Sequence, residues 1–82
     1  MLRRRMVMQM ILRDLLKLFP EGSEQQINLI YPDYHCVYIP NPGFMLDGKW
    51  DSTLNMKVTS LDVELYTEES KTIALLVIGV KE

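Results

Sequence analysis

The sequence lacks a pair of cysteines, a long apolar run and a glycine-rich motif, and each absence argues against a class of protein. Its single cysteine, Cys36, cannot form an internal disulfide, so a reducing cytoplasm is the expected setting. Apart from the N-terminus, the longest apolar run covers residues 73–80, far short of the roughly 18 residues that span a membrane. The four glycines are scattered and none opens a predicted helix, which argues against a phosphate-binding loop.

Composition and length indicate one ordinary globular domain over residues 1–82. Hydrophobic residues make up 48% and charged residues 24%, which argues against disorder. The net charge of −2 is unevenly distributed: residues 1–17 contain five basic residues and Asp14, a net +4, which leaves −6 for the rest. A basic N-terminal segment and an acidic remainder can attract different partners.

A 3.6-residue apolar period predicts an amphipathic helix over residues 6–18. The residues on its apolar stripe are Met8, Ile11, Leu12, Leu15 and Phe19. Pro20 ends the helix because proline has no N–H and disfavours helical angles in the residue before it. Arg4 would lie on the apolar stripe, so residues 1–5 are expected to form a frayed basic extension.

Alternating apolar residues predict strands over residues 25–31 and 56–66, a β-branched and aromatic run predicts one over 36–39, and a continuous apolar run predicts one over 71–80. The strands at 25–31 and 36–39 are expected to form a hairpin, and the one at 71–80 to be a central strand because it is apolar on both faces. The apolar parity shifts within 56–66, which predicts a bulge near Thr59 and Ser60. A turn is expected at 67–70, and residues 40–55 form a long loop. The fold class is α+β, with the helix packed on an antiparallel sheet of about four strands.

Two segments carry a resemblance to a known group of proteins. Residues 11–24 read ILRDLLKLFPEGSE, and residues 58–63 read VTSLDV. This pattern resembles small uncharacterised open reading frames of phages and prophages, which share a helix ending in a proline-containing turn, a strand, and a V-T-S strand leading into a final hairpin. The resemblance implies an origin in a mobile element. It brings no known activity and no site residues.

The residues give little support to catalysis or metal binding. His35 and Cys36 are adjacent on a predicted strand and point to opposite faces, so they cannot act as a pair. Asp33 and His35 share a parity and can lie together, either as part of a site or as a turn aspartate beside a surface histidine. One histidine and one cysteine are too few ligands for zinc. No catalytic residue, metal or cofactor is predicted.

Aromatic and acidic residues are the candidates for binding a protein partner. Tyr34, Phe44 and Trp50 lie in or near loops, where rigid rings anchor interfaces, although Phe44 and Trp50 could instead cap the core. Asp62 and Glu64 alternate onto one face of the last hairpin and form either an acidic patch for a basic partner or a solvated sheet face.

The sequence therefore predicts a small non-catalytic protein-binding module, encoded by a phage or other mobile element and acting in the host cell cytoplasm. Inhibition of a host defence protein is one concrete form of this function. The alternative is a nucleic-acid-associated accessory factor that contacts phosphates through Arg3, Arg4 and Arg5. No small-molecule substrate or membrane is implied.

The apolar strand at 73–78 also bears on assembly. One short helix covers one face of the sheet, so the second face needs other cover. A homodimer is expected on this argument. The alternatives are a host protein, or the loop at 40–55 folding over the second face to give a monomer.

Overall fold

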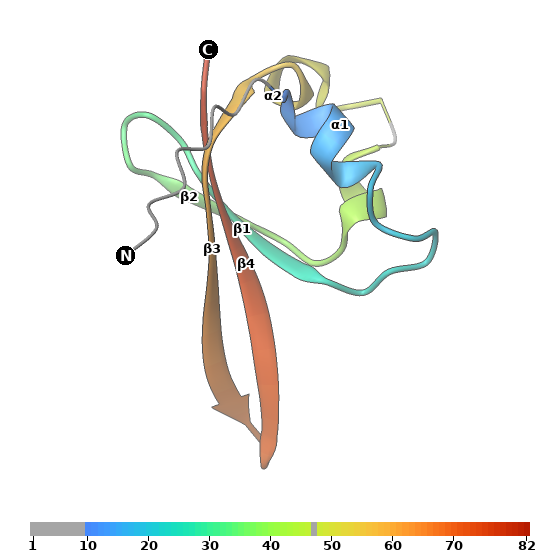
Figure 1. The fold of residues 1–82 in the computed structure, drawn as a ribbon, viewed down its shortest axis with the longest axis vertical. Helices are drawn as coiled ribbons and strands as arrows, with labels where there is room; N and C mark the ends of the chain where they lie inside the picture. The colour runs from blue at the N-terminus through green and yellow to red at the C-terminus, as the bar shows by residue number, and fades with distance from the viewer. Residues whose placement is uncertain (1–9, 47) are drawn as a thin grey trace, which may run out of the picture.

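A computed structural model describes residues 10–46 and 48–82 and shows a small α+β fold (Figure 1). The elements in chain order are α1 (Leu12–Leu16), β1 (Gln26–Ile30), β2 (Cys36–Ile39), the 3-10 helix η1 (Pro42–Met45), α2 (Asp51–Leu54), β3 (Lys57–Glu68) and β4 (Lys71–Lys81). Within these residues, four strands form one sheet, and three short helical segments lie between or before them.

The sheet is mixed, so the prediction of an antiparallel sheet is wrong. The strand order is β2-β1-β4-β3. The neighbours β1 and β2 are antiparallel, as are β3 and β4, but β1 and β4 run parallel. The reason is the connection after β2, which carries the chain to the far edge of the sheet and starts β3 there, so that β4 returns beside β1 in the same direction. β4 is a central strand, as predicted.

Both hairpins are confirmed, and the second has a tight turn. Only Glu69 and Ser70 separate β3 from β4, and both have positive φ values, 51° and 66°. Two positive φ values are typical of the type I′ turn, whose twist matches that of the strands it joins. The predicted irregularity in β3 is also present, because the register with β4 shifts between Val58 and Ser60.

The first helix is shorter than the predicted range of 6–18. Ile11 is extended, and the segment around it pairs with β3: the Leu12 N–H donates to the Met56 carbonyl at 2.9 Å, and the Val58 N–H donates to the Met10 carbonyl at 3.0 Å. Backbone pairing with β3 therefore replaces the helical bonds that the apolar stripe suggested. Residues 6–9, and the extension predicted at 1–5, lie outside the described residues.

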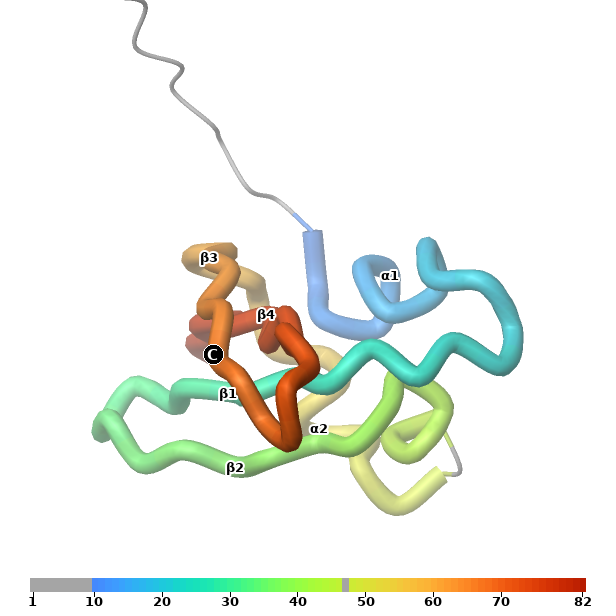
Figure 2. The backbone as a smooth tube through the Cα atoms, turned by 90° about the horizontal axis from the view of Figure 1, so that it is seen from below, coloured from blue at the N-terminus to red at the C-terminus, as the bar shows by residue number. Residues whose placement is uncertain are grey.

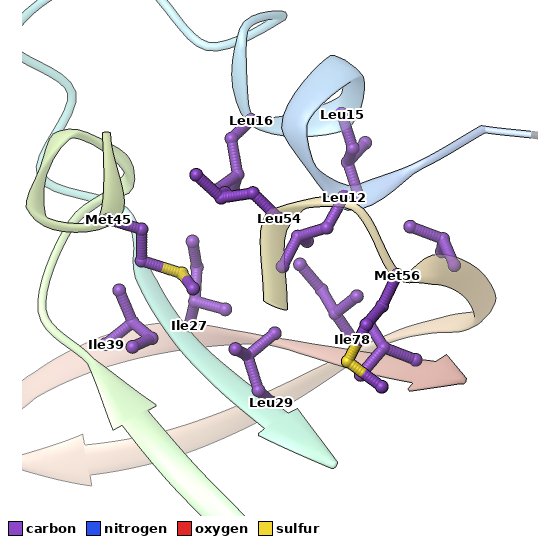
Figure 3. Close-up of a cluster of buried hydrophobic side chains, with 12 residues drawn as sticks. Leu12, Leu15, Leu16, Ile27, Leu29, Ile39, Met45, Leu54, Met56 and Ile78 are labelled. Carbon is purple, nitrogen blue, oxygen red and sulfur yellow. The ribbon is translucent and has the colours of Figure 1, made fainter. Parts of the chain in front are cut away.

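The buried core lies on one face of the sheet (Figure 3). Its members come from α1, from the strands and from the segment between β2 and β3, and include Leu12, Leu15, Leu16, Ile27, Leu29, Ile39, Met45, Leu54, Val58, Ile78 and Val80. Met45 and Leu54 join the same cluster as Leu12. The segment at 40–55 therefore packs on the face that α1 covers, and the alternative in which it covers the second face is wrong.

Candidate functional site

The hairpin of β3 and β4 extends beyond the rest of the sheet. β1 pairs with β4 only between Leu75 and Gly79, so the part of β4 nearest the turn has β3 as its one neighbour among the described strands. Figure 1 shows the hairpin reaching away from the helices, and Figure 2 looks towards the same molecule from the side of the hairpin turn. We call residues 61–74 the projecting hairpin: residues 65–74 lie beyond the last β1–β4 pair, and residues 61–64 are the stretch of β3 that leads to them.

Polar contacts attach the projecting hairpin to the start of β1. The Tyr66 hydroxyl donates to Gln26 Oε1 at 2.7 Å. The side-chain amide of Gln25 donates to the Ala74 carbonyl at 2.8 Å. These bonds tie the hairpin to β1 at Tyr66 and Ala74, beyond the last β1–β4 pair, so its orientation relative to the core is defined.

Three apolar side chains line one face of the projecting hairpin, and we call Leu61, Val63 and Leu65 the apolar row. Their partners across the hairpin are Ile78, Leu76 and Ala74, so the row continues the face on which the core is built. The exposed fractions rise from 39% at Leu61 to 61% at Val63 and 70% at Leu65. The row is exposed because α1 and the segment at 40–55 do not reach it.

Three carboxylates lie on the opposite face of β3, with Tyr66 between the last two, and we call Asp62, Glu64 and Glu68 the acidic row. Their β4 partners are Val77, Leu75 and Lys71, which places them on the face away from the core. All three are exposed. The prediction that Asp62 and Glu64 share a face is confirmed by this register.

Among the described residues, the outer edge of β3 has no partner along the projecting hairpin. β3 is an edge strand, and Met10–Leu12 pairs with it only as far as Val58. Beyond the bulge, from Ser60 to Glu68, none of the described residues pairs with this edge. Edge strands present unpaired N–H and C=O groups to which another extended chain can bind.

The aromatic residues predicted to bind a partner lie on other elements. Phe44 in η1 and Trp50 before α2 form a tilted ring pair with centroids 6.0 Å apart, and Trp50 packs against the core. Tyr34 lies in the turn between β1 and β2 with φ at 71° and is 84% exposed. The structure thus brings Phe44 to Trp50, and Asp62 to Glu64, but it places these two pairs and Tyr34 on three separate segments.

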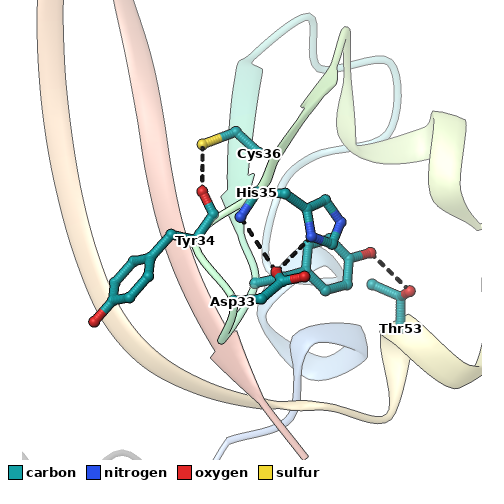
Figure 4. Close-up of polar contacts among 6 residues, drawn as sticks. Asp33, Tyr34, His35, Cys36 and Thr53 are labelled. Atoms are coloured by element: carbon teal, nitrogen blue, oxygen red, sulfur yellow. Dashed lines mark hydrogen bonds and ion pairs between the residues drawn. The ribbon is translucent and has the colours of Figure 1, made fainter.

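A second polar cluster surrounds the β1–β2 turn (Figure 4). The His35 Nδ1 and Asp33 Oδ1 atoms form a hydrogen bond, as the shared parity predicted, and the His35 ring stacks on Tyr31 with centroids 4.4 Å apart. The side-chain hydrogen bond from His35, followed by the one from its backbone N–H, lowers the pKa of Asp33. The Tyr31 hydroxyl hydrogen-bonds to Thr53 Oγ1 at 2.9 Å.

This cluster borders a shallow pocket of about 370 Å³. In the described parts of the chain, no hydroxyl hydrogen-bonds to the second ring nitrogen of His35. The Cys36 thiol donates instead to the Tyr34 carbonyl at 3.8 Å. The hydrogen bonds therefore order the turn, with Asp33 accepting from both the backbone and the ring of His35.

The remaining predictions concern the N-terminal arginines, metal binding and membrane spans. Arg3, Arg4 and Arg5 lie outside the described residues. Within residues 10–46 and 48–82, no group of three or more potential metal-ligating side chains comes together, and no helix is long and apolar enough to cross a bilayer.

Comparisons with known proteins returned nothing: no protein-family model, curated protein or solved structure matches the chain. The resemblance to phage reading frames therefore stays a prediction.

The sequence predicted the strand that contains Leu61, Val63 and Leu65, but not that these three side chains are exposed. The signal available for their exposure was the shortness of the predicted helix against the length of the last two strands.

Proposed function

We propose that this chain is a small non-catalytic protein-binding module and that the projecting hairpin is its binding surface. The observation that carries the proposal is the apolar row, in which three neighbouring apolar side chains on one face become progressively more exposed toward the turn. Contiguous exposed apolar side chains bordered by polar residues are typical of interaction surfaces.

The attachment of the hairpin supports the same function. A binding element held in place before it meets its partner loses less conformational entropy on binding than a free segment does. Tyr66 and Gln25 provide that attachment through their bonds to Gln26 and Ala74. Blocking a surface of a host defence protein, in the host cytoplasm, is the form of this function that the sequence favours.

The test compares two leucines that are equally exposed but differently placed. Leu65 in the apolar row is 70% exposed, and Leu18 after α1 is 71% exposed. Proteins captured from a host lysate by the parent chain are purified and titrated against the parent, Leu65→Ser and Leu18→Ser. We expect Leu65→Ser to weaken binding by about tenfold or more, because it removes an apolar side chain that the partner would bury in the complex. Leu18→Ser should leave binding unchanged.

Two results would contradict the proposal. A captured protein that binds Leu65→Ser as tightly as the parent does not use the hairpin. A chain that captures no protein above the background of an unrelated protein of the same size has no partner in that host. The nucleic-acid alternative, which rests on Arg3, Arg4 and Arg5, is tested separately by titrating salt against binding to random duplex DNA.

A further inference from the structure

We infer that the hairpin binds an extended segment of a partner protein, which adds to the outer edge of β3 as a further strand and carries alternating apolar and basic side chains. This inference rests on the proposed function and specifies the partner's chemistry. It follows from three features of the same stretch of β3: its open edge, its alternation and the single sign of its charges.

The chain already shows this binding mode at the start of β3. Met10 and Ile11, which precede α1, lie along the outer edge of β3: the Val58 N–H donates to the Met10 carbonyl, and the Leu12 N–H at the start of α1 donates to the Met56 carbonyl. Met10 also packs against the buried core. The same edge continues from Ser60 to Glu68 with no partner among the described residues, so an extended chain can be accepted there in the same way.

The alternation along β3 determines what such a strand must carry. Side chains at paired positions of neighbouring strands lie on the same face of a sheet. A strand beside β3 therefore has one set of side chains next to the apolar row and the alternate set next to the acidic row. Apolar residues match the first set, and lysine or arginine matches the three carboxylates of the acidic row, which share their face with Tyr66.

The charges also argue against a second copy of this chain as the occupant. A two-fold antiparallel pair of β3 strands centred on Val63 would place Asp62 directly opposite Glu64 of the other copy, twice. Like charges directly opposite destabilise a strand pair. A dimer through the faces of two apolar rows would use three side chains from each copy, whereas a stable interface uses roughly 20 to 30 residues a side. A basic strand at the edge avoids the like-charge pairs, and its main-chain hydrogen bonds to β3 add to the side-chain contacts.

The probe for this inference is a synthetic peptide of about nine residues, the length of chain that lies along residues 60–68. It alternates valine or leucine with lysine or arginine. One control peptide has the same composition in two blocks, and a second has glutamate in place of every basic residue. Binding to the full chain is measured by fluorescence anisotropy, and the site by amide hydrogen exchange.

We expect the alternating peptide to bind about tenfold more tightly than either control. Amides of residues 60–68 should become protected, because bonds to the peptide replace bonds to water. Asp62→Asn combined with Glu64→Gln should lower the affinity for the alternating peptide by about fivefold or more. Leu65→Ser should lower it by a similar factor. The matched controls are Asp14→Asn combined with Glu21→Gln, which removes the same charge outside the hairpin, and Leu18→Ser. Both controls should bind as the parent does.

Several results would overturn the inference. Equal binding of the block peptide excludes recognition of alternating side chains, and protection elsewhere in the sheet excludes this edge. A doubled mass in light scattering that Leu65→Ser abolishes identifies a second copy as the occupant. A rise of about tenfold in peptide affinity when Arg3, Arg4 and Arg5 are changed to serine identifies the chain's own first residues as the occupant.

The two proposals can fail separately. If a captured protein needs Leu65 while none of the peptides binds the hairpin, the partner uses the surface without adding a strand, and only this inference is wrong. If neither the captured proteins nor the peptides depend on Leu65, the hairpin is not a binding surface and both proposals are wrong.

Discussion

The two ends of the β3–β4 pair carry similar residues in different surroundings. We call the part of the molecule outside the projecting hairpin the body. Where the β3–β4 pair lies in the body, Val58 and Ile78 are 1% and 0% exposed. Toward the turn, Val63 and Leu65 lie on the same face of the same strands and are mostly exposed. The difference is the cover that α1 and the segment at 40–55 provide at one end only. Alternation along a strand thus shows which face is apolar, whereas burial of that face depends on how far α1 and the segment at 40–55 extend over it.

The largest effect expected from this comparison is on stability. Leu16→Ala should lower the free energy of unfolding by about 2 to 5 kcal/mol, because Leu16 is 1% exposed and its truncation leaves a cavity. Leu65→Ala should change it by less than about 0.5 kcal/mol, as exposed positions usually do. Urea denaturation followed by circular dichroism measures both. Equal losses for the two variants would show that the projecting hairpin is packed as tightly as the body.

The elements that could be predicted from the sequence are those with local signals. Alternation and turn residues predicted the β1–β2 hairpin, and the change of parity predicted the bulge between Val58 and Ser60. The parallel pairing of β1 with β4 could not be predicted, since it joins distant segments and has no local signature. Helix α1 is short because Ile11 pairs with Lys57, a tertiary backbone contact that outweighs the apolar stripe.

The same limit applies to the candidate site. Asp62 and Glu64 were predicted to share a face because strand alternation alone decides it. The exposure of Leu61, Val63 and Leu65 was not predicted, because it depends on how far the cover extends across the sheet. Met45 and Leu54 are buried in the segment at 40–55, but Met45 lies in an apolar run of only three residues and Leu54 stands among polar residues, so neither gives a periodic signal.

The boundary between the two regions can be tested at Gly79, where β4 passes the bulge in β3. A Cβ added at Gly79 would lie 2.5 Å from Ser60 Oγ and 2.9 Å from Thr59 Oγ1. Gly79→Ala should therefore cost about 1 to 3 kcal/mol, the usual range for overpacking. Thermal and urea denaturation measure this loss.

A second substitution gives the control for Gly79. Ser60→Ala removes the oxygen that the new methyl group meets first, so the double variant should recover part of the lost stability. If Gly79→Ala is as stable as the parent, the hydroxyls of the bulge rotate away freely, and the close contact does not fix the boundary between the body and the hairpin.

The turn of the hairpin tests whether the two regions unfold together. Glu69 and Ser70 both have positive φ values, a conformation that asparagine and glycine adopt at lower cost. Glu69→Asn combined with Ser70→Gly should stabilise the turn by about 1 kcal/mol. The end of β4 near the turn pairs only with β3 among the described strands, so we expect it to open locally before the body unfolds.

Amide hydrogen exchange separates the local effect from the global one. Exchange at residues 71–74 should slow by about fivefold, which corresponds to 1 kcal/mol, while the urea midpoint changes little. A midpoint that rises by the full stabilisation would show instead that the projecting hairpin and the body unfold as one unit.

The smallest effect is expected on the pH dependence of stability, and it concerns the body at the β1–β2 turn. Hydrogen bonds from His35 lower the pKa of Asp33 below its ordinary value of 3.8 in the folded chain. The charged carboxylate therefore contributes stability that is fully present above pH 3.8 and is lost as the pH falls through the lower folded value. Asp33→Asn keeps an oxygen that accepts from His35 but removes the charge. Urea midpoints of parent and variant should differ above pH 3.8 and converge below it, and His35→Ala should abolish most of the difference because it removes the ring hydrogen bond. A difference that stays constant across this range would mean that the Asp33–His35 bond is not maintained in solution.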